Sequence, residues 1–426
     1  MADAMTASAV RDARLVSGRA GERLATALLL AGVGLLPLQQ WEPASVFDFA
    51  VMGSDILFLA AICVRGIVLC TGNAPARLGA FHAWIAVYLL ASLLAALVLM
   101  ESPGFPAAFA KWIGIAWLCA IAALACDAAS DAATRRHLML AWLLGTVLAS
   151  LLAHVAIAGF YLGDGPRTWV APLLSHYGSL PPGPYPRVMG TFANANMAGL
   201  FLLLSVGIGL TAHDRGWLSV NRLRALLLLV PLPLLATGSQ AIGAVVLLLA
   251  WYWSRSTLAS RGWRLVVVAS GGLFAIANLA LLLINPDAPL EQPSVRMQLW
   301  QESWSTWQAH FWRGAGLAEP AAGLTYKAPD GTQQYLTDAH NIVLNLGAQG
   351  GVLVVFSFLG VVGWLLMKGW RLPAFSAAWA ALLLAVGYLG IGGSFEDARV
   401  LWVFMGLFAG FIVGSESRNA QRPTST

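Results

Sequence analysis

Long apolar stretches recur along the whole chain and constrain its fold more than any other feature. Hydrophobic residues make up 58% of the 426 residues and charged residues only 11%, whereas a soluble domain carries about 25% charged residues. A membrane-spanning helix needs about 20 apolar residues. The sequence therefore predicts an all-α polytopic membrane protein with about 12 transmembrane helices, at 22–40, 45–67, 79–99, 107–127, 136–162, 192–212, 222–237, 239–254, 262–284, 341–368, 373–393 and 398–415.

The pair 222–237 and 239–254 could also be read as one helix. Such a helix would be about 50 Å long at 1.5 Å per residue, which is too long for one crossing and short for two. Pro231, Pro233 and Gly238 interrupt the pair and favour a kinked hairpin.

The distribution of basic residues tests the number of spans and their orientation. With the N-terminus in the cytoplasm, alternating spans place 18 of the 25 Lys and Arg residues on the cytoplasmic side and five on the other side, namely Arg167, Arg187, Arg296, Arg313 and Lys327. A single span over 222–254 would invert every later span and destroy this asymmetry. We therefore predict that both termini are cytoplasmic, and that the net charge of +5 reflects membrane topology rather than nucleic-acid binding.

Two loops on the non-cytoplasmic side are long, at 163–191 and 285–340. The second contains Trp300, Trp304, Trp307 and Phe311 at spacings of 4, 3 and 4, which is one face of a helix. We expect this helix, over 294–312, to lie flat on the membrane interface or to cap the bundle. The predicted organisation is a membrane region at 1–284 with about nine spans, a large outer loop at 285–340, about three spans at 341–415, and a disordered cytoplasmic tail at 416–426.

Arginine is rare in exported loops, so Arg187 and Arg296 need an explanation. Arg187 closely precedes a span, and Arg296 lies one turn before Trp300, at the edge of the tryptophan face. Guanidinium groups match phosphate oxygens, so both residues could bind a phosphate-bearing lipid. The alternative is contact with lipid headgroups or a salt bridge within the loop.

His340 precedes an apolar run and is predicted to lie in the first turn of a helix that Asp338 caps. The positive end of a helix dipole and nearby arginines disfavour imidazolium. A neutral histidine could therefore accept a proton near pH 7. The alternative is a polar residue at the membrane interface that binds a backbone group.

Other polar residues near predicted span ends have open roles. Asn194 and Asn196 could cap a helix or bind substrate, and Ser239-Gln240 could line a cavity or simply form a turn. Asp55 could be buried within its span or lie near the outer interface. The sequence holds no Walker loop, Rossmann glycine pattern or HExxH motif. We therefore expect no metal and no cofactor.

These motifs together resemble the O-antigen ligase and polymerase superfamily of bacterial inner membranes. The resemblance covers about residues 185–365, and the earlier spans match only in hydropathy. Such proteins often carry Ser-Arg where this chain has Ser239-Gln240. This chain therefore has one cation fewer for binding the phosphates of a substrate. The residues that carry the resemblance are Arg187, Gly190-Thr191-Phe192-Ala193-Asn194-Ala195-Asn196, Arg296, Gly314-Ala315-Gly316, His340-Asn341-Ile342-Val343-Leu344, Gly347 and Gly350.

The resemblance implies a glycosyltransferase that uses a glycan on undecaprenyl diphosphate as donor and a sugar hydroxyl of lipid A–core as acceptor. Arg187 and Arg296 would hold the diphosphate, and His340 would be the catalytic base of an inverting, metal-independent reaction on the periplasmic face. Asn194, Asn196, Gln240, Trp300 and Asn341 are possible substrate-binding residues. The expected location is the bacterial inner membrane.

Three alternatives stay open. An O-antigen polymerase would use a second lipid-linked glycan as acceptor, and a protein O-oligosaccharyltransferase would use a protein hydroxyl. The His340-Asn341 pair at the end of the long loop favours the ligase, and the moderate length disfavours the protein-modifying branch. A transporter or flippase would carry ionisable residues near the middle of its spans, where this chain has few.

Overall fold

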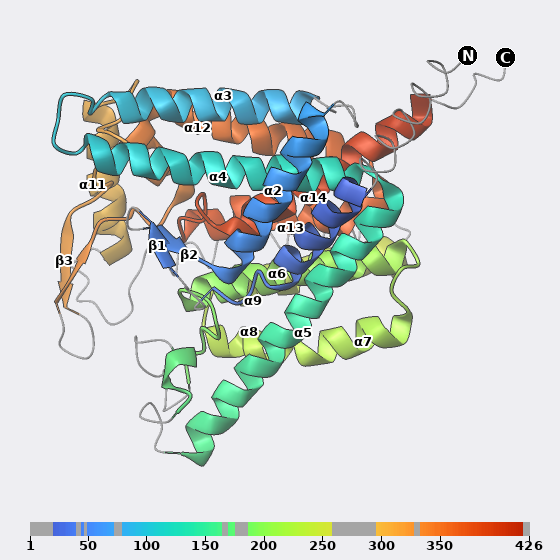
Figure 1. Ribbon diagram of the computed structural model, residues 1–426. Coiled ribbons are helices and arrows are strands. Elements are labelled where there is room, and N and C mark those ends of the chain that lie inside the picture. Colours follow the sequence, from blue (N-terminus) through green and yellow to red (C-terminus); the bar gives the residue numbers. More distant parts are fainter. Residues whose placement is uncertain are drawn as a thin grey trace, which may run out of the picture.

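A computed structural model describes residues 20–39, 44–46, 49–71, 79–163, 169–174, 186–257, 295–327 and 333–420. The chain is mainly helical, with two short antiparallel hairpins (Figure 1). After a helix over 20–34, the elements are β1 (Ala44–Val46), β2 (Phe49–Val51), α2 (Gly53–Cys70), α3 (Ala80–Leu97), α4 (Phe105–Ser130), α5 (Ala132–Leu162), η2 (Ala171–Leu173), α6 (Ala195–Asp214), α7 (Val220–Leu229), α8 (Pro231–Thr237), α9 (Ala241–Thr257), α11 (Val295–Ala309), β3 (Leu324–Lys327), β4 (Gln333–Leu336), α12 (Ile342–Gly369), η3 (Pro373–Phe375), α13 (Ser376–Gly387), η4 (Leu389–Ile391) and α14 (Arg399–Ala420).

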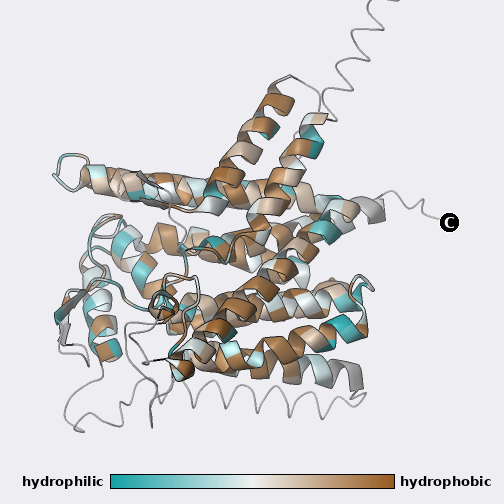
Figure 2. Cartoon of the chain, turned by 60° about the horizontal axis from the view of Figure 1, so that its bottom comes forward, coloured by the Kyte–Doolittle hydropathy of each residue, from teal (hydrophilic) through white to brown (hydrophobic). Residues whose placement is uncertain are grey.

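Eight helical segments in the described part of the chain are long and apolar enough to cross a membrane. Two shorter apolar helices, over Ala241–Ser254 and Ser376–Ile391, add to them. Hydrophobic residues dominate these helices, and hydrophilic residues gather at their ends (Figure 2). The chain is therefore a multi-pass membrane protein. The ninth predicted span, 262–284, lies outside the described residues, so the total of twelve stays a prediction.

The second predicted span begins later than its hydropathy suggested. Residues 44–46 and 49–51 pair as β1 and β2, and α2 starts only at Gly53. Asp55 lies in the first turn of α2, where its carboxylate accepts the Met52 N–H at 2.9 Å. Its other oxygen contacts Arg399 Nε at 2.9 Å, so this buried carboxylate ties the start of α2 to the start of α14.

The segment 220–257 is a kinked hairpin, as predicted. The helix breaks between α7 and α8 at Pro231, and Gly238 ends α8 with a φ of 58°. The chain then returns as α9, which packs beside α6.

The C-terminal helix continues further than predicted. Residues 416–420 were expected in a disordered tail, but α14 is helical up to Ala420. Its apolar face and its contacts with the bundle extend the helix beyond the last apolar run, and Glu416 pairs with Lys368 at 2.9 Å. Residues 421–426 lie outside the described residues.

Small residues let α14 approach α4 closely. Gly406 faces the Ala122 backbone, and Gly410 faces Cys126 and Ala129. A Cβ at Gly406 would lie 2.3 Å from the Ala122 carbonyl oxygen, so a larger residue cannot fit. This spacing of glycines by four residues is a frequent packing device of membrane helices. It places the segment before α14 beside the first turns of α4.

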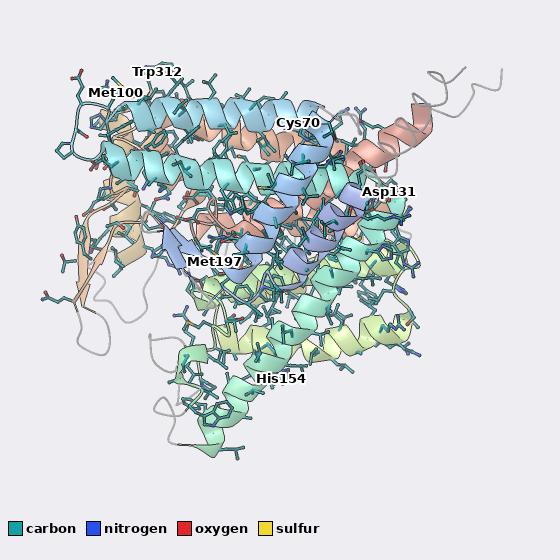
Figure 3. The ribbon with its side chains drawn as sticks, in the orientation of Figure 1. Cys70, Met100, Asp131, His154, Met197 and Trp312 are labelled. Carbon is teal, nitrogen blue, oxygen red and sulfur yellow. The ribbon has the colours of Figure 1, made fainter. Side chains whose placement is uncertain are left out.

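The bundle has two ends, which we name by labelled residues. Met100 and Trp312 lie at the Trp312 end, whereas Cys70 and Asp131 lie at the opposite, Asp131 end (Figure 3). Helix α11 and both hairpins gather at the Trp312 end (Figure 1). All candidate site residues described below belong to elements that begin or end there.

Candidate functional site

Arg187 lies in an extended segment beside α8. Val188 N–H donates to the Ala236 carbonyl at 2.8 Å, which fixes this segment against the helix. Arg187 Nε donates to the Thr237 carbonyl at 3.2 Å. The guanidinium is therefore held at the C-terminal end of α8, where the helix dipole favours a cation.

Helix α11 contributes Arg296 and Trp300, one turn apart. Arg296 Nη1 and Trp300 Nε1 are buried, and neither has a hydrogen-bond partner within the described ranges. A buried donor without an acceptor costs about 1–3 kcal/mol. Burial lowers the pKa of Arg296, and the charge of Arg187 lowers it further. Two guanidinium groups thus lie close enough to repel each other, an arrangement suited to an anion.

His340 directly precedes α12, with a φ of 49°. Its N–H donates to Asp338 Oδ1 at 2.6 Å, and its Nδ1 lies 3.9 Å from the same oxygen. Burial lowers the pKa of His340, Asp338 raises it, and Arg296 lowers it again. The net lowering keeps the imidazole neutral at pH 7, so it can accept a proton. This agrees with the predicted charge state.

The local prediction around His340 was wrong in one respect. Asn341, not Asp338, caps α12, because Asn341 Oδ1 accepts the N–H groups of Val343 and Leu344 at 3.0 and 3.1 Å. Asp338 instead accepts the His340 N–H. His340 therefore lies outside the first turn, with 41% of its side chain accessible to solvent.

Asp338, which neighbours His340, also influences the carboxyl groups of Glu396 and Asp397, and these two residues were not predicted from the sequence. Asp338 accepts a hydrogen bond from the Ser394 hydroxyl, and Glu396 accepts one from Asn345 Nδ2. Burial raises the pKa of Glu396, and the charges of Asp397 and Asp338 raise it further. The sequence did offer a signal, because an acidic pair at the end of a span is rare unless it has a function.

The surroundings of Asp397 and Glu396 differ. Asp397 is exposed to solvent. The Glu396 side chain is buried, and its Oε2 has no hydrogen-bond partner among the described residues. A buried carboxyl beside two others avoids a third negative charge by keeping its proton. Glu396 is therefore neutral, and Asp397 is the more exposed of the two carboxyl groups.

The loop after α11 is inserted into a break in α12. The carbonyls of Ala348 and Gln349 accept the N–H groups of Ala315 and Gly316 at 2.8 and 3.1 Å. Gly351 interrupts the helix with a φ of 70° and lies directly against the Trp312 backbone. These contacts satisfy the backbone groups that the break exposes. They also hold α11, with Arg296, in a fixed position relative to α12 and His340.

The remaining predicted residues lie in three different settings. Asn194 caps α6, since its side chain accepts the Met197 N–H at 2.9 Å, and Asn196 lies half-buried in the first turn. Asn341 Nδ2 donates to the Ile391 carbonyl at 3.3 Å. Gln240, at the turn between α8 and α9, packs against Gly392. Its Nε2 is buried and has no hydrogen-bond partner in the described part. Gln240 therefore supplies a second donor near Arg187, because it lies three residues after Thr237, whose carbonyl accepts from Arg187.

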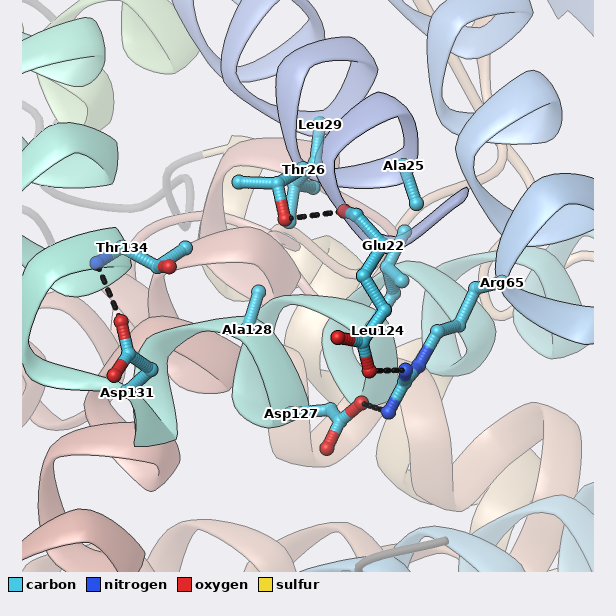
Figure 4. A pocket seen from close by; sticks show the side chains of 10 residues that line it. All are labelled: Glu22, Ala25, Thr26, Leu29, Arg65, Leu124, Asp127, Ala128, Asp131 and Thr134. Carbon is cyan, nitrogen blue, oxygen red and sulfur yellow. Dashed lines mark hydrogen bonds and ion pairs between the residues drawn. The ribbon is translucent and has the colours of Figure 1, made fainter. Parts of the chain in front are cut away.

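A separate cavity of about 300 Å³ lies at the Asp131 end (Figure 4). Arg65 crosses it and contacts Glu22 at 3.0 Å and Asp127 at 2.6 Å. Asp131 accepts the Thr134 N–H at 2.9 Å and so caps α5. These contacts join the helix over 20–34 to α2 and α4. The cavity shares no lining residue with the cluster around His340.

A comparison with known protein families finds a match within this part of the chain. Residues 199–359 match the family model described as O-antigen ligase. This match supports the resemblance of this part of the chain to the O-antigen ligase superfamily. No curated protein matches the chain.

The matched region contains most of α6, α7 to α9, α11, β3, β4 and most of α12, and therefore Gln240, Arg296, Trp300 and His340. Arg187 lies just before it, and the carboxyl pair of Glu396 and Asp397 lies after it. The family is one of glycosyltransferase-like proteins that act on lipid-linked glycans in membranes. The chain thus combines the family region with charged groups that elements on either side supply.

Proposed function

We propose that this chain is an O-antigen ligase. It transfers a glycan from undecaprenyl diphosphate to a sugar hydroxyl of lipid A–core, at the periplasmic face of a bacterial inner membrane. The observation that carries the proposal is the group of Arg187, Arg296 and His340, which come from three separate segments: Arg187 lowers the pKa of Arg296, and Arg296 lowers the pKa of His340. The family match at 199–359 supports the same reaction class.

The donor diphosphate binds at the two arginines. Arg296 Nη1 and Trp300 Nε1 offer buried donors that lack described partners, and phosphate oxygens are acceptors only. Binding would satisfy these donors and relieve the repulsion between Arg187 and Arg296. As the bond to the sugar breaks, negative charge grows on the departing diphosphate, and the guanidinium groups stabilise it.

His340 accepts the proton of the attacking hydroxyl. The acceptor oxygen forms a bond to the anomeric carbon, while the bond from that carbon to the diphosphate oxygen breaks. Undecaprenyl diphosphate leaves with the bonding electron pair, and the hydroxyl proton moves to His340. Direct displacement inverts the anomeric configuration. Asp338, with an oxygen 3.9 Å from His340 Nδ1, stabilises the imidazolium that forms.

Arginine charges take the place of a bound cation in this reaction, so we propose that it needs neither a divalent metal nor ATP. The site lies at the end of the bundle where we expect the periplasmic loops, with both chain termini cytoplasmic. Both substrates are anchored in the membrane, and a site at this end meets them at the outer leaflet.

Transfer by the purified protein tests the proposal. Protein in detergent is mixed with undecaprenyl-diphosphate glycan and, in separate reactions, with rough lipopolysaccharide, a second lipid-linked glycan, or an exported protein. We expect product only with rough lipopolysaccharide, with inverted anomeric configuration, and equally in EDTA. Product with the lipid-linked glycan would identify a polymerase, and glycosylated protein an oligosaccharyltransferase. Movement of donor across vesicles without transfer would identify a flippase.

A further inference from the structure

The backbone of His340 has a conformation that needs support from its surroundings. Its φ of 49° lies in the left-handed region, and no other described residue except glycine has a positive φ. A residue with a Cβ keeps such a conformation where neighbouring contacts hold it, and strain of this kind collects at sites of chemistry. The contacts that hold His340 therefore indicate which residues place it for its reaction.

Asp338 holds the histidine from the side of the preceding loop. Its Oδ1 accepts the His340 N–H at 2.6 Å and lies 3.9 Å from His340 Nδ1. One carboxylate oxygen thus binds the backbone of this histidine and faces its ring. Because 44% of the Asp338 side chain is exposed, burial alone does not fix its rotamer, and a further contact has to hold it.

Ser394 supplies that contact. Its hydroxyl donates to the same oxygen, Asp338 Oδ1. Ser394 lies between η4 and α14, outside the matched region at 199–359. The Asp338 carboxylate is therefore held between a donor of its own loop and a donor from a segment 56 residues further along the chain.

The segment that carries Ser394 is itself fixed to the loop before α12. Glu396 Oε1 accepts from Asn345 Nδ2, and Asn345 Oδ1 accepts the Ala339 N–H at 3.3 Å. The Glu396 carbonyl accepts from Trp402 Nε1 at 2.6 Å, which attaches the same segment to α14. Ser394 therefore reaches Asp338 from a rigid support, and a change at Ser394 can be made without removing these other contacts.

We propose that Ser394 is a positioning residue for the proton transfer: its hydroxyl holds the Asp338 carboxylate beside His340, so that Nδ1 faces the carboxylate and Nε2 takes the proton of the attacking hydroxyl. This inference rests on the proposed function. The carboxylate favours the tautomer with its proton on Nδ1 and stabilises the imidazolium that forms when Nε2 accepts a second proton. Ser394 acts through Asp338 and does not itself contact the reacting atoms.

Loss of the Ser394 hydroxyl should change the reaction in a defined direction. Burial lowers the pKa of His340, Asp338 raises it, and Arg296, from α11, lowers it. In Ser394→Ala the carboxylate can turn toward solvent, so the pKa of His340 falls further and the imidazolium loses its partner. The acid limb of kcat/KM should then move to lower pH. We expect kcat on the plateau to fall by about 10 to 100-fold, because a misplacement of about 1 Å can cost about 10²-fold.

A titration by NMR tests this role without any enzymatic activity. The protein is labelled with ¹³C at histidine Cε1, and the signal of His340, one of seven histidines, is identified by its absence from His340→Gln. We expect this signal to titrate at lower pH in Ser394→Ala than in wild type. Ser394→Thr keeps the hydroxyl and should titrate like wild type. An unchanged titration in Ser394→Ala, or one at higher pH, would overturn the proposal.

Transfer rates of the same proteins separate positioning from packing. In Ser394→Ala we expect a lower kcat with an unchanged KM for the donor, because Arg187 and Arg296 keep their places, and Ser394→Thr should recover the wild-type rate. A lower kcat with the acid limb unmoved would show that Ser394 only packs its segment, and would overturn the proposal.

Two further variants guard against a general loss of structure. Ser394→Cys keeps the size of the side chain but offers only a weak donor, so it should change kcat and the acid limb in the same direction even if Ser394→Ala does not fold. Ser357→Ala is the matched control, since the Ser357 hydroxyl donates to the Val354 carbonyl within α12, and it should leave both unchanged. Absence of transfer in wild type would refute the proposed function, while the NMR titration would still decide the role of Ser394.

Discussion

Replacing Arg296 should change stability and donor binding in opposite directions. In the free protein, Arg296 Nη1 is buried without a described partner, and Arg187 repels the same guanidinium. An unsatisfied buried donor costs about 1–3 kcal/mol. Arg296→Met keeps most of the stem and removes this cost, so we expect the free protein to unfold at a temperature a few degrees higher.

The same substitution should weaken binding of the donor. A hydrogen bond to a charged group contributes about 1.5–3 kcal/mol, and each 1.4 kcal/mol is about a tenfold change in Kd. Loss of one such contact predicts a Kd for a polyprenyl diphosphate that is about 10 to 150 times higher. Arg296→Lys should recover only part of it, because an ammonium cannot form a two-pronged contact with phosphate.

Thermal unfolding in detergent, with and without polyprenyl diphosphate, measures both effects in one assay. Arg313→Met is the matched control, since Arg313 is exposed near the same end of the bundle. It should change neither the unfolding temperature nor the shift that the ligand causes. The reasoning is refuted if Arg296→Met lowers the stability of the free protein or leaves the ligand-induced shift intact.

Three further predictions concern the base, the helix break and the topology. His340→Ala should lower transfer by about 10² to 10⁴-fold, while the stabilisation of the protein by donor persists. Because the pKa of His340 is lowered, wild-type activity should fall only as the pH drops below about 6.5. A loss of activity that begins at higher pH would exclude His340 as the titrating group. Gly314→Ala should impair both folding and transfer, since a Cβ there would lie 2.3 Å from the Gln349 backbone, whereas Gly363→Ala, with nothing within 4 Å, should be neutral or stabilise by up to about 1 kcal/mol; equal melting temperatures would contradict this. A cysteine at the exposed position of Thr325 should react with an impermeant thiol reagent in spheroplasts, and the exposed native Cys70 should not; the reverse pattern would invert the proposed orientation.

The sequence predicted most helices because their signals are local. Apolar length identifies spans, and Pro231 and Gly238 mark the kinked hairpin without reference to any distant residue. The three residues proposed for the site, Arg187, Arg296 and His340, could be selected from the sequence because Arg and His are unusual in loops predicted to be exported. Their proximity could be expected only from a shared side of the membrane and from the family resemblance.

The missed features depend on contacts between distant segments. Hydropathy does not distinguish a continuous α12 from one that a loop enters at Gly351, because the accepting groups are backbone carbonyls. Asn341 and Asp338 are both good capping residues, and only the three-dimensional path of the chain decides between them. No pattern in the sequence indicated that Glu396 has polar neighbours, because Asn345 and Asp338 come from α12 and the loop before it.

The insertion of residues 311–316 into α12 also determines which nearby segment can change in sequence and length without moving the site. One end of the segment 317–340 is held by that insertion, and the other end by the Asn341 cap. Between these two attachments, the described strands β3 and β4 pair with each other and project from the Trp312 end, and Gly323, just before β3, donates its N–H to Glu302 of α11 at 2.8 Å (Figure 1). The hairpin can therefore be lengthened, exchanged or made to carry an affinity tag while the arginines and the histidine keep their spacing, which makes it the natural place to attach the protein to a surface or a probe.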